Sequence, residues 1–180
     1  MRLQSLSHLL EVARAIAHPR RIIILGSSSL LVQHPELGSP GQPLELTMDA
    51  DLLLEPVNEA IAETLQIAAG QDSAFMAEFG YYADILRPDI VNALPTGWES
   101  RLYPVAGYEN VFALDVYDLA MVKLVLGRLK DLELLRALLR LGILEPTRLQ
   151  RHYQEAPLNE RDAFAAGRNL GLLLANQGTT

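Results

Sequence analysis

LELTMDADLLL (residues 44–54) places two aspartates, Asp49 and Asp51, two positions apart inside an apolar run. Side chains alternate between the two faces of a β-strand, so this spacing predicts a strand with Thr47, both aspartates and Leu53 on one face. The apolar side chains between them are expected to point the other way, into a core. The stretch therefore predicts a strand that carries acidic chemistry on one side of a sheet.

The two carboxylates would lie side by side on that face, where like charges repel unless a cation lies between them. Mg²⁺ and Mn²⁺ prefer carboxylate oxygens as ligands. Asp49 and Asp51 are therefore candidate metal ligands. The alternative is a strand on a solvated sheet face, where both carboxylates are simply hydrated.

The composition excludes several kinds of site. The chain has 180 residues and no cysteine, which excludes disulfides, thiol nucleophiles, zinc–thiolate sites and iron–sulfur clusters. No apolar run approaches the roughly 20 residues that span a bilayer. The first 21 residues read as an amphipathic helix and not as a signal peptide, because Glu11 and Arg14 interrupt them. We expect a cytoplasmic protein that has no membrane partner.

Charge is unevenly distributed along the chain. Residues 49–118 carry thirteen acidic and two basic side chains, a net charge of −11, whereas residues 119–180 have a net charge of +3. An acidic middle is unsuited to non-specific binding of nucleic acid but suits a divalent metal. The basic last third either holds an anion against that metal or forms the polar faces of helices.

The pattern of elements predicts the fold class. Helices are expected at 5–17, 57–69, 73–79, 117–126, 130–141, 146–153 and 159–174, and strands at 21–25, 44–54, 81–86, 101–105 and 111–114. Because strands come early and helices dominate late, we predict an α/β (α+β) fold. A small mixed sheet with flanking helices covers residues 1–116, and a helical subdomain, residues 117–180, packs with it as one globular unit.

Several stretches together resemble the nucleotidyltransferase superfamily, which has the DNA polymerase β-like fold. They are LGSSSLL (25–31), TMDADLLLE (47–55), YYADILRPD (81–89), LPTGWESRL (94–102) and DLAMVKLVLGRLKDLELL (118–135). A Gly-Ser turn after a strand, followed by Asp-x-Asp on the next strand, is similar to the superfamily's signature. The last stretch resembles the C-terminal motif of AbiEii-type toxins and related uncharacterised bacterial families. The resemblance runs from about residue 21 to residue 141.

The resemblance implies roles for the early motifs. Gly26 lets the backbone approach a phosphate, and Ser27 caps the following helix and donates to a phosphate oxygen. Asp49 and Asp51 hold one or two Mg²⁺ ions that bridge the triphosphate and the attacking group. The fold adds a third carboxylate, as a metal ligand or as a base. Asp84 is the candidate for it, and Asp115 is the alternative.

The resemblance also implies a triphosphate site on the helix that starts near Tyr117. If that helix continues through Gly127, then Lys123, Lys130 and Asp131 share its face. Lys123 would neutralise the triphosphate with support from Lys130 or Arg128, and Asp131 would orient one of the lysines. The alternative is a solvated face laced with salt bridges.

The function that the resemblance implies is metal-dependent transfer of a nucleoside monophosphate from an NTP to a hydroxyl acceptor. The acceptor would be RNA, a protein side chain or a small molecule. A toxin role, with a cognate antitoxin as partner, is implied by the AbiEii-type relatives. The alternative function is a catalytically inactive nucleotide-binding or protein-interaction module on the same scaffold.

Overall fold

The computed structural model describes residues 1–56 and 58–175 of the chain. They fall into two compact units. The first comprises Met1–Val91 and Arg101–Asp115, and the second comprises Asn92–Ser100 and the chain from Val116 onward. The five strands lie in the first unit and the four C-terminal helices lie in the second.

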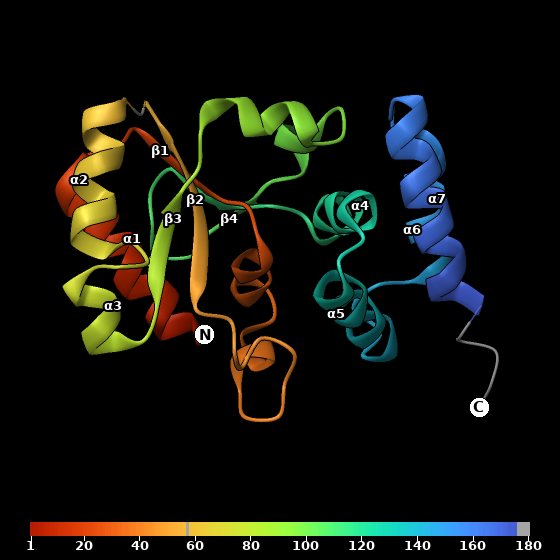
Figure 1. Cartoon of the computed structure of the whole chain (residues 1–180), viewed down its shortest axis with the longest axis horizontal. Helices are drawn as coiled ribbons and strands as arrows, with labels where there is room; N and C mark the ends of the chain where they lie inside the picture. The colour runs from red at the N-terminus through yellow and green to blue at the C-terminus, as the bar shows by residue number, and fades with distance from the viewer. Residues whose placement is uncertain (57, 176–180) are drawn as a thin grey trace. The chain divides into compact units, whose positions relative to one another are not determined.

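The sheet of the first unit has the strand order β3-β2-β1-β5-β4 (Figure 1). The strands are β1 (Arg21–Ile24), β2 (Asp49–Glu55), β3 (Tyr82–Ile85), β4 (Tyr103–Pro104) and β5 (Val111–Ala113). Strand β1 is antiparallel to β2 and parallel to β5, while β2 is parallel to β3 and β4 is antiparallel to β5. The predicted mixed sheet with helices, an α+β fold, is therefore confirmed.

Strand β2 begins at Asp49, five residues later than the sequence predicts. The backbone before it is used in other bonds: the Leu44 amide donates to the Leu37 carbonyl at 2.9 Å, and the Thr47 amide donates to the Leu44 carbonyl at 3.2 Å. The prediction that Thr47 shares the strand face with the aspartates is therefore wrong. The aspartates themselves lie at the very start of the strand.

Three α-helices complete the first unit. They are α1 (Leu3–Ala17), α2 (Glu59–Ala69) and α3 (Ala74–Phe79), of which α1 and α2 lie along one face of the sheet (Figure 1). Helix α1 ends at Ala17, and the next residue, His18, has a left-handed φ of 44° and is followed by Pro19. The Asn58 side chain caps α2 by accepting a hydrogen bond from the Ile61 amide, while the predicted start at Val57 lies outside the described residues.

The apolar side of β2 belongs to the core. Ala50, Leu52 and Leu54 are at most 1% exposed, and so are Ile22 and Ile24 on β1. Burying one leucine or isoleucine side chain contributes about 1.5–3 kcal/mol to the free energy of unfolding. Packing of these apolar side chains in the core therefore fixes the orientation of β2. The aspartates project from its opposite face.

The second unit is built around α4 (Val116–Leu126), which packs against α5 (Leu129–Arg140), α6 (Pro146–Glu155) and α7 (Glu160–Ala175). Buried residues occur on every side of α4, as expected of a helix surrounded by neighbours. Short 3₁₀ helices, η3 (Pro88–Ala93) and η4 (Trp98–Arg101), span the points where the chain passes between the units.

The chain turns sharply at Gly127, between α4 and α5. Gly127 has a left-handed φ of 59°, and a Cβ there would lie 2.3 Å from Nδ2 of Asn169. That amide nitrogen donates to the Leu124 carbonyl at 2.7 Å, near the end of α4. The two separate helices predicted at 117–126 and 130–141 are therefore confirmed, and the condition of one helix through Gly127 is not met, because the glycine adopts a conformation that ends a helix.

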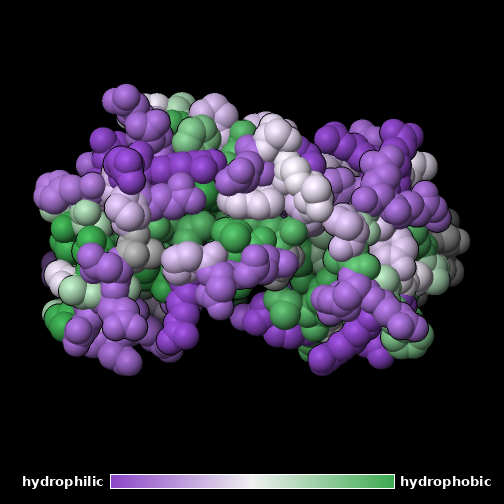
Figure 2. All heavy atoms as spheres, turned by 90° about the horizontal axis from the view of Figure 1, so that it is seen from above, coloured by the Kyte–Doolittle hydropathy of each residue, from purple (hydrophilic) through white to green (hydrophobic). Residues whose placement is uncertain are grey.

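Hydrophobic residues show among hydrophilic ones at the surface (Figure 2). Leu46 is 87% exposed, the highest value among the large hydrophobic residues that the structure describes. Within residues 1–56 and 58–175, no helix has the length and apolar content that a bilayer span requires.

Candidate active site

The candidate active site lies at one edge of the sheet, where four strands bring their polar ends together. Strands β1 and β5 end at this edge, and β2 and β3 begin there, because β2 runs antiparallel to β1 and β3 runs parallel to β2. Asp49 and Asp51 open β2, and the chain leaves β1 through Leu25 and Gly26. The topology therefore gathers segments that are up to about ninety residues apart in the sequence.

Three aspartates share one face at this edge. Asp51 is the register partner of Asp84 on β3, and Asp49 is the partner of Tyr82. Partners in neighbouring strands project to the same side, typically with Cβ atoms about 5 Å apart. Asp49 and Asp51 are half-buried and Asp84 is exposed. The predicted sharing of a face by Asp49 and Asp51 is confirmed, and the register adds Asp84 to it.

Asp115, the alternative third carboxylate, reaches the same edge from the other side of β1. It follows β5, and the preceding Leu114 amide donates to the Ile24 carbonyl at 2.9 Å. Asp115 is only 4% exposed. The direct pairing of Asp84 with Asp51 supports Asp84 over Asp115 as the third member of the acidic face.

Gly26 lies directly against the acidic face. A Cβ on Gly26 would fall 1.5 Å from Oδ2 of Asp51, closer than any two non-bonded atoms approach. The neighbouring Leu25 amide donates to the Asp51 carbonyl at 2.9 Å, which fixes this approach. The absence of a side chain at Gly26 therefore makes room for the Asp51 carboxylate, a reason for glycine that the sequence does not reveal.

The serines after Gly26 form a 3₁₀ helix, η1 (Ser27–Val32). Gly26 itself occupies the N-cap position, so the prediction that Ser27 caps this helix is wrong. Ser27 is half-buried, whereas Ser28 and Ser29 are fully buried. Among the described residues, neither buried hydroxyl has a hydrogen-bond partner, which costs each about 1–3 kcal/mol. Sequence reasoning missed this pair, because burial cannot be read from a run of serines.

Tyr82 is a further member of the site that the sequence analysis did not single out. Burial raises the pKa of its phenol, and the carboxylates of Asp49, Asp84 and Asp51 raise it further. The phenol therefore stays protonated and remains a hydrogen-bond donor next to the carboxylates. The signal in the sequence is its position two residues before Asp84, which puts both side chains on one strand face.

The acidic edge fits a hard divalent cation through two carboxylates. Within the part of the chain that the structure describes, no three acidic or histidine side chains are close enough to surround a metal ion. Mg²⁺ does not need such a cage, because it keeps several waters and is held by one or two carboxylates together with substrate phosphates. Asp49 and Asp51 are the two carboxylates that would supply this donor set.

Three of the predicted triphosphate residues of the second unit, Lys123, Arg128 and Asp131, form an ion cluster around the buried Asp131 carboxylate. Lys123 Nζ lies 3.0 Å from Asp131 Oδ1, and Arg128 Nε lies 2.6 Å from Asp131 Oδ2. Lys123 is 6% exposed and Asp131 is 1% exposed, while Lys130 points to solvent. Although they do not share a helix face, Asp131 does orient Lys123, as predicted.

The electrostatics of this cluster favour the ionised pair. Burial alone would raise the pKa of Asp131, but hydrogen bonds from Arg128 and Lys123 outweigh it and hold the pKa below its usual value. The structure therefore gives Lys123 a partner within its own unit. A contact between Lys123 and a triphosphate stays a prediction.

A model of the family described as "Nucleotidyltransferase of unknown function (DUF6036)" matches residues 1–162 of the chain. The matched span includes the acidic edge, Gly26, the serines and the ion cluster around Asp131. No curated protein and no solved structure matches the chain.

Proposed function

The chain belongs to the DUF6036 family of nucleotidyltransferases, and we propose that it transfers a nucleoside monophosphate from an NTP to a hydroxyl acceptor with the help of Mg²⁺. The observation that carries the proposal is the edge where Gly26 meets Asp51 and Asp51 pairs with Asp84. It joins a backbone turn suited to phosphate with carboxylates suited to a metal.

The proposed reaction is an in-line displacement at the α-phosphorus. The acceptor oxygen forms a bond to this phosphorus while the bond to the pyrophosphate oxygen breaks, and the hydroxyl proton passes to a base. Asp49 and Asp51 would hold Mg²⁺, which when bound neutralises charge on the phosphates. Asp84 is the proposed base or further ligand.

The start of η1 is proposed to receive the triphosphate. Gly26 and Ser27 present a backbone turn without a bulky side chain, and exposed amides at a helix start attract anions. The Tyr82 phenol, which stays protonated, is a donor on the same acidic face. Additional roles for Lys123, Arg128, Lys130 and Asp131 in phosphate binding stay predictions, as does a toxin role with an antitoxin partner.

The test is label transfer from α-³²P-labelled NTPs with Mg²⁺. We expect wild-type protein to release pyrophosphate, and the double substitution Asp49→Ala with Asp51→Ala to abolish release. The matched control removes two charges from the exposed surface of α2, Glu59→Ala with Glu63→Ala, and should keep wild-type activity. Unchanged activity in the aspartate double variant would refute the metal site.

The third carboxylate is tested in the same assay. Asp84→Asn should lower kcat about 10²-fold or more if Asp84 acts as the base, because general base catalysis typically contributes 10²–10⁴-fold. Asp115→Asn serves as its comparison and should keep most of the activity. If Asp115→Asn loses more activity than Asp84→Asn, the third carboxylate is Asp115.

A second candidate function is nucleotide binding without transfer. Two observations favour it: the described residues form no three-membered metal cluster, and Lys123 is committed to Asp131. This function predicts a Mg²⁺-dependent rise in Tm with NTP but no pyrophosphate release from any NTP.

A further inference from the structure

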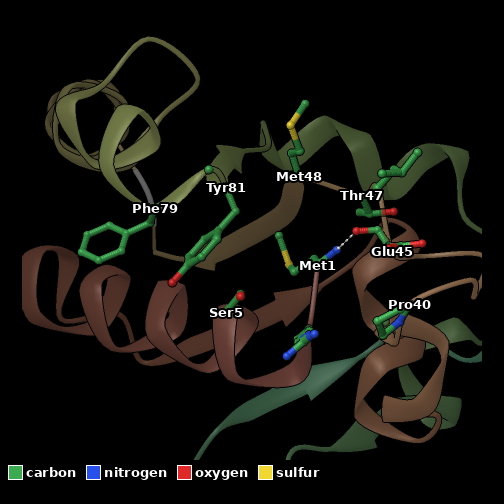
Figure 3. Close-up of a pocket in the computed structure, with 12 residues that line it drawn as sticks. Met1, Ser5, Pro40, Glu45, Thr47, Met48, Phe79 and Tyr81 are labelled. Carbon is green, nitrogen blue, oxygen red and sulfur yellow. Dashed lines mark hydrogen bonds between the residues drawn. The ribbon is translucent and has the colours of Figure 1, made fainter.

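Exposed hydrophobic side chains remain outside the acidic edge. Some line a pocket of about 390 Å³ whose wall includes Phe79 and Tyr81 (Figure 3). The Tyr81 hydroxyl lies 2.9 Å from Nδ1 of His8 on α1, so this pocket opens on the helix-covered face of the sheet, away from the carboxylates. Others lie on α7 in the second unit, where Phe164 is 76% exposed and Leu172 is 51% exposed. Because α7 already packs against α4, α5 and α6 through its buried side, its exposed side needs a different explanation.

Four exposed residues of α7 follow one line along the helix surface. They are Glu160, Phe164, Arg168 and Leu172, each four positions after the one before, and we call them the α7 ridge. Side chains at this spacing form one of the ridges through which helices pack against each other. The buried residues of α7 lie on the other side of the helix. The α7 ridge is therefore a helix-packing surface that faces solvent.

The charges of the α7 ridge are arranged symmetrically about Phe164, with an acid four positions before it and a base four positions after it. Glu160 and Arg168 are about 12 Å apart along the helix axis, so they do not pair within one chain. Among the described residues Glu160 has no ion pair, and the Arg168 guanidinium makes one long hydrogen bond, 3.4 Å, to Oδ1 of Asn169. Both charges are thus available to a partner.

Two copies of α7 can pair antiparallel about a two-fold axis at Phe164. In that arrangement Phe164 meets Phe164 of the second copy, and Glu160 of each copy meets Arg168 of the other. Arg161, another exposed base on this side of the helix, then lies opposite Gly167 of the second copy and meets no like charge. A two-fold dimer requires a surface that is complementary to itself, and the α7 ridge has this property.

The same side chains select the antiparallel arrangement over the parallel one. In a parallel pair Glu160 would face Glu160 and Arg168 would face Arg168, and like charges placed opposite each other disfavour a pairing. In the antiparallel pair both contacts join opposite charges, which fix the register of the two helices. The two Phe164 rings cover each other between these ion pairs, as aromatic rings at an interface do.

We propose that the α7 ridge is a dimerisation surface whose occupant is a second copy of this chain. Phe164 lies at the two-fold axis, and an ion pair between Glu160 and Arg168 lies on each side of it. The dimer is independent of the proposed transfer reaction, because α7 carries none of the residues of that site. Interfaces below about 1,200 Å² belong to weak complexes, so a contact built from one helix of each copy should be reversible and in the micromolar range.

Sedimentation velocity of the full chain over a wide range of protein concentration tests the association. The wild type should change from monomer to dimer as the concentration rises. Arg168→Glu should weaken the dimer about tenfold or more, because Glu160 and residue 168 would then carry like charges. Arg140→Glu, the same change of charge at an exposed position of α5, is the matched control and should associate like the wild type.

Mixing two charge variants tests the register. Glu160→Arg chains and Arg168→Glu chains should each be monomeric alone, because like charges meet at both contacts of either homodimer. An equimolar mixture should form mixed dimers, since each base then faces an acid, and native mass spectrometry distinguishes these from homodimers. Both positions are exposed, so circular dichroism should show wild-type folding. A mixture that stays monomeric would overturn the proposed pairing.

Phe164→Ser tests the centre of the interface. Loss of the ring should weaken the dimer about tenfold or more without unfolding the protein, because Phe164 is exposed in the single chain. A dimer that tolerates both Phe164→Ser and Arg168→Glu would lie elsewhere on the molecule and would overturn the proposal. A wild-type protein that stays monomeric at every concentration would overturn it as well.

Discussion

At the scale of single residues, the contact of Gly26 with Asp51 is the most restrictive feature of the site. A carboxylate oxygen occupies the place where any other residue at position 26 would have its Cβ. The Asp51 side chain can adopt this orientation only because residue 26 has no side chain. The Asp51 carboxylate therefore lies directly against the backbone at the start of η1, so one glycine joins the metal side and the phosphate side of the proposed site.

Gly26→Ala is predicted to impair the site more than the fold. The new methyl group must displace the Asp51 carboxylate, which should cost about 1–3 kcal/mol in the free energy of unfolding. The rise in Tm produced by Mg²⁺ and NTP should be lost. Thermal and urea unfolding, with and without Mg²⁺ and NTP, measure both effects.

Gly171→Ala in α7 is the control for that substitution, because a Cβ there meets open space. It should stabilise the helix slightly and leave ligand binding unchanged. A Gly26→Ala protein that binds Mg²⁺ and NTP like the wild type would contradict the reading of this contact.

The parts of the site that depend on strand alternation and on the order of the motifs could be predicted from the sequence. Asp49 and Asp51 were correctly placed on one strand face because strand geometry is local. The pairing of Asp84 with Asp51 depends on how two strands thirty residues apart align, and no local pattern specifies that register. Burial of Ser28 and Ser29, and the environment of Tyr82, depend equally on neighbours that are distant in the sequence.

At the scale of elements, the ion cluster of Lys123, Arg128 and Asp131 joins α4 to α5 across the turn at Gly127. Lys123 comes from the last turns of α4 and Asp131 from the first turn of α5. A buried charge left without its partner is strongly destabilising. The cluster therefore opposes any change in the angle between these two helices.

Asp131→Asn is predicted to destabilise the protein in a pH-dependent way. The pKa of the Asp131 carboxyl is held below its ordinary 3.8, so its ionised form stabilises the fold above that pH. This contribution is lost as the pH falls from 3.8 through the lower folded-state pKa. At pH 7 the variant should lose about 3–5 kcal/mol, and its difference from wild type should narrow below pH 4.

Urea unfolding followed by circular dichroism at pH 7, 4 and 3 measures this difference. Glu133→Gln, an exposed acid on the same helix, is the control and should follow the wild type at each pH. A gap that stays constant down to pH 3 would show that Asp131 is not the titrating group.

Most helices and strands were predicted from sequence within a few residues, because their apolar periodicity and caps are local signals. The break between α4 and α5 at Gly127 was predicted too, but the contact that fixes its geometry is distant in the sequence. The amide of Asn169, forty-two positions further on, bonds the Leu124 carbonyl near the end of α4 and stands next to the glycine. Helical propensity around Gly127 carries no trace of that contact.

At the scale of the whole molecule, charge limits the class of acceptor. The formal net charge is −7, and the segment that holds Asp49, Asp51 and Asp84 is the most acidic part of the chain. Binding to a polyphosphate backbone draws its free energy from basic side chains that release counterions. The proposed site has no surplus of basic side chains, so an uncharged acceptor suits it better than a long nucleic acid.

We therefore predict weak binding to single-stranded RNA. A fluorescent 20-nucleotide RNA should bind with a Kd no lower than about 10⁻⁶ M at physiological salt, measured by fluorescence anisotropy. Binding in the nanomolar range that weakens steeply at 200 mM salt would contradict this prediction. Glu59→Gln with Glu63→Gln, which removes two charges from α2, should not create RNA binding.

The backbone bonds at the start of β2 have a consequence for protein engineering. The Leu25 amide and the Tyr82 amide bind the carbonyls of Asp51 and Met48 from opposite sides, so two neighbouring strands clamp the strand entry. The segment from Ser39 to Thr47 lies outside that clamp. Exchanging the exposed residues of this segment should therefore leave the two carboxylates in their positions, which makes it a suitable region to randomise in a library.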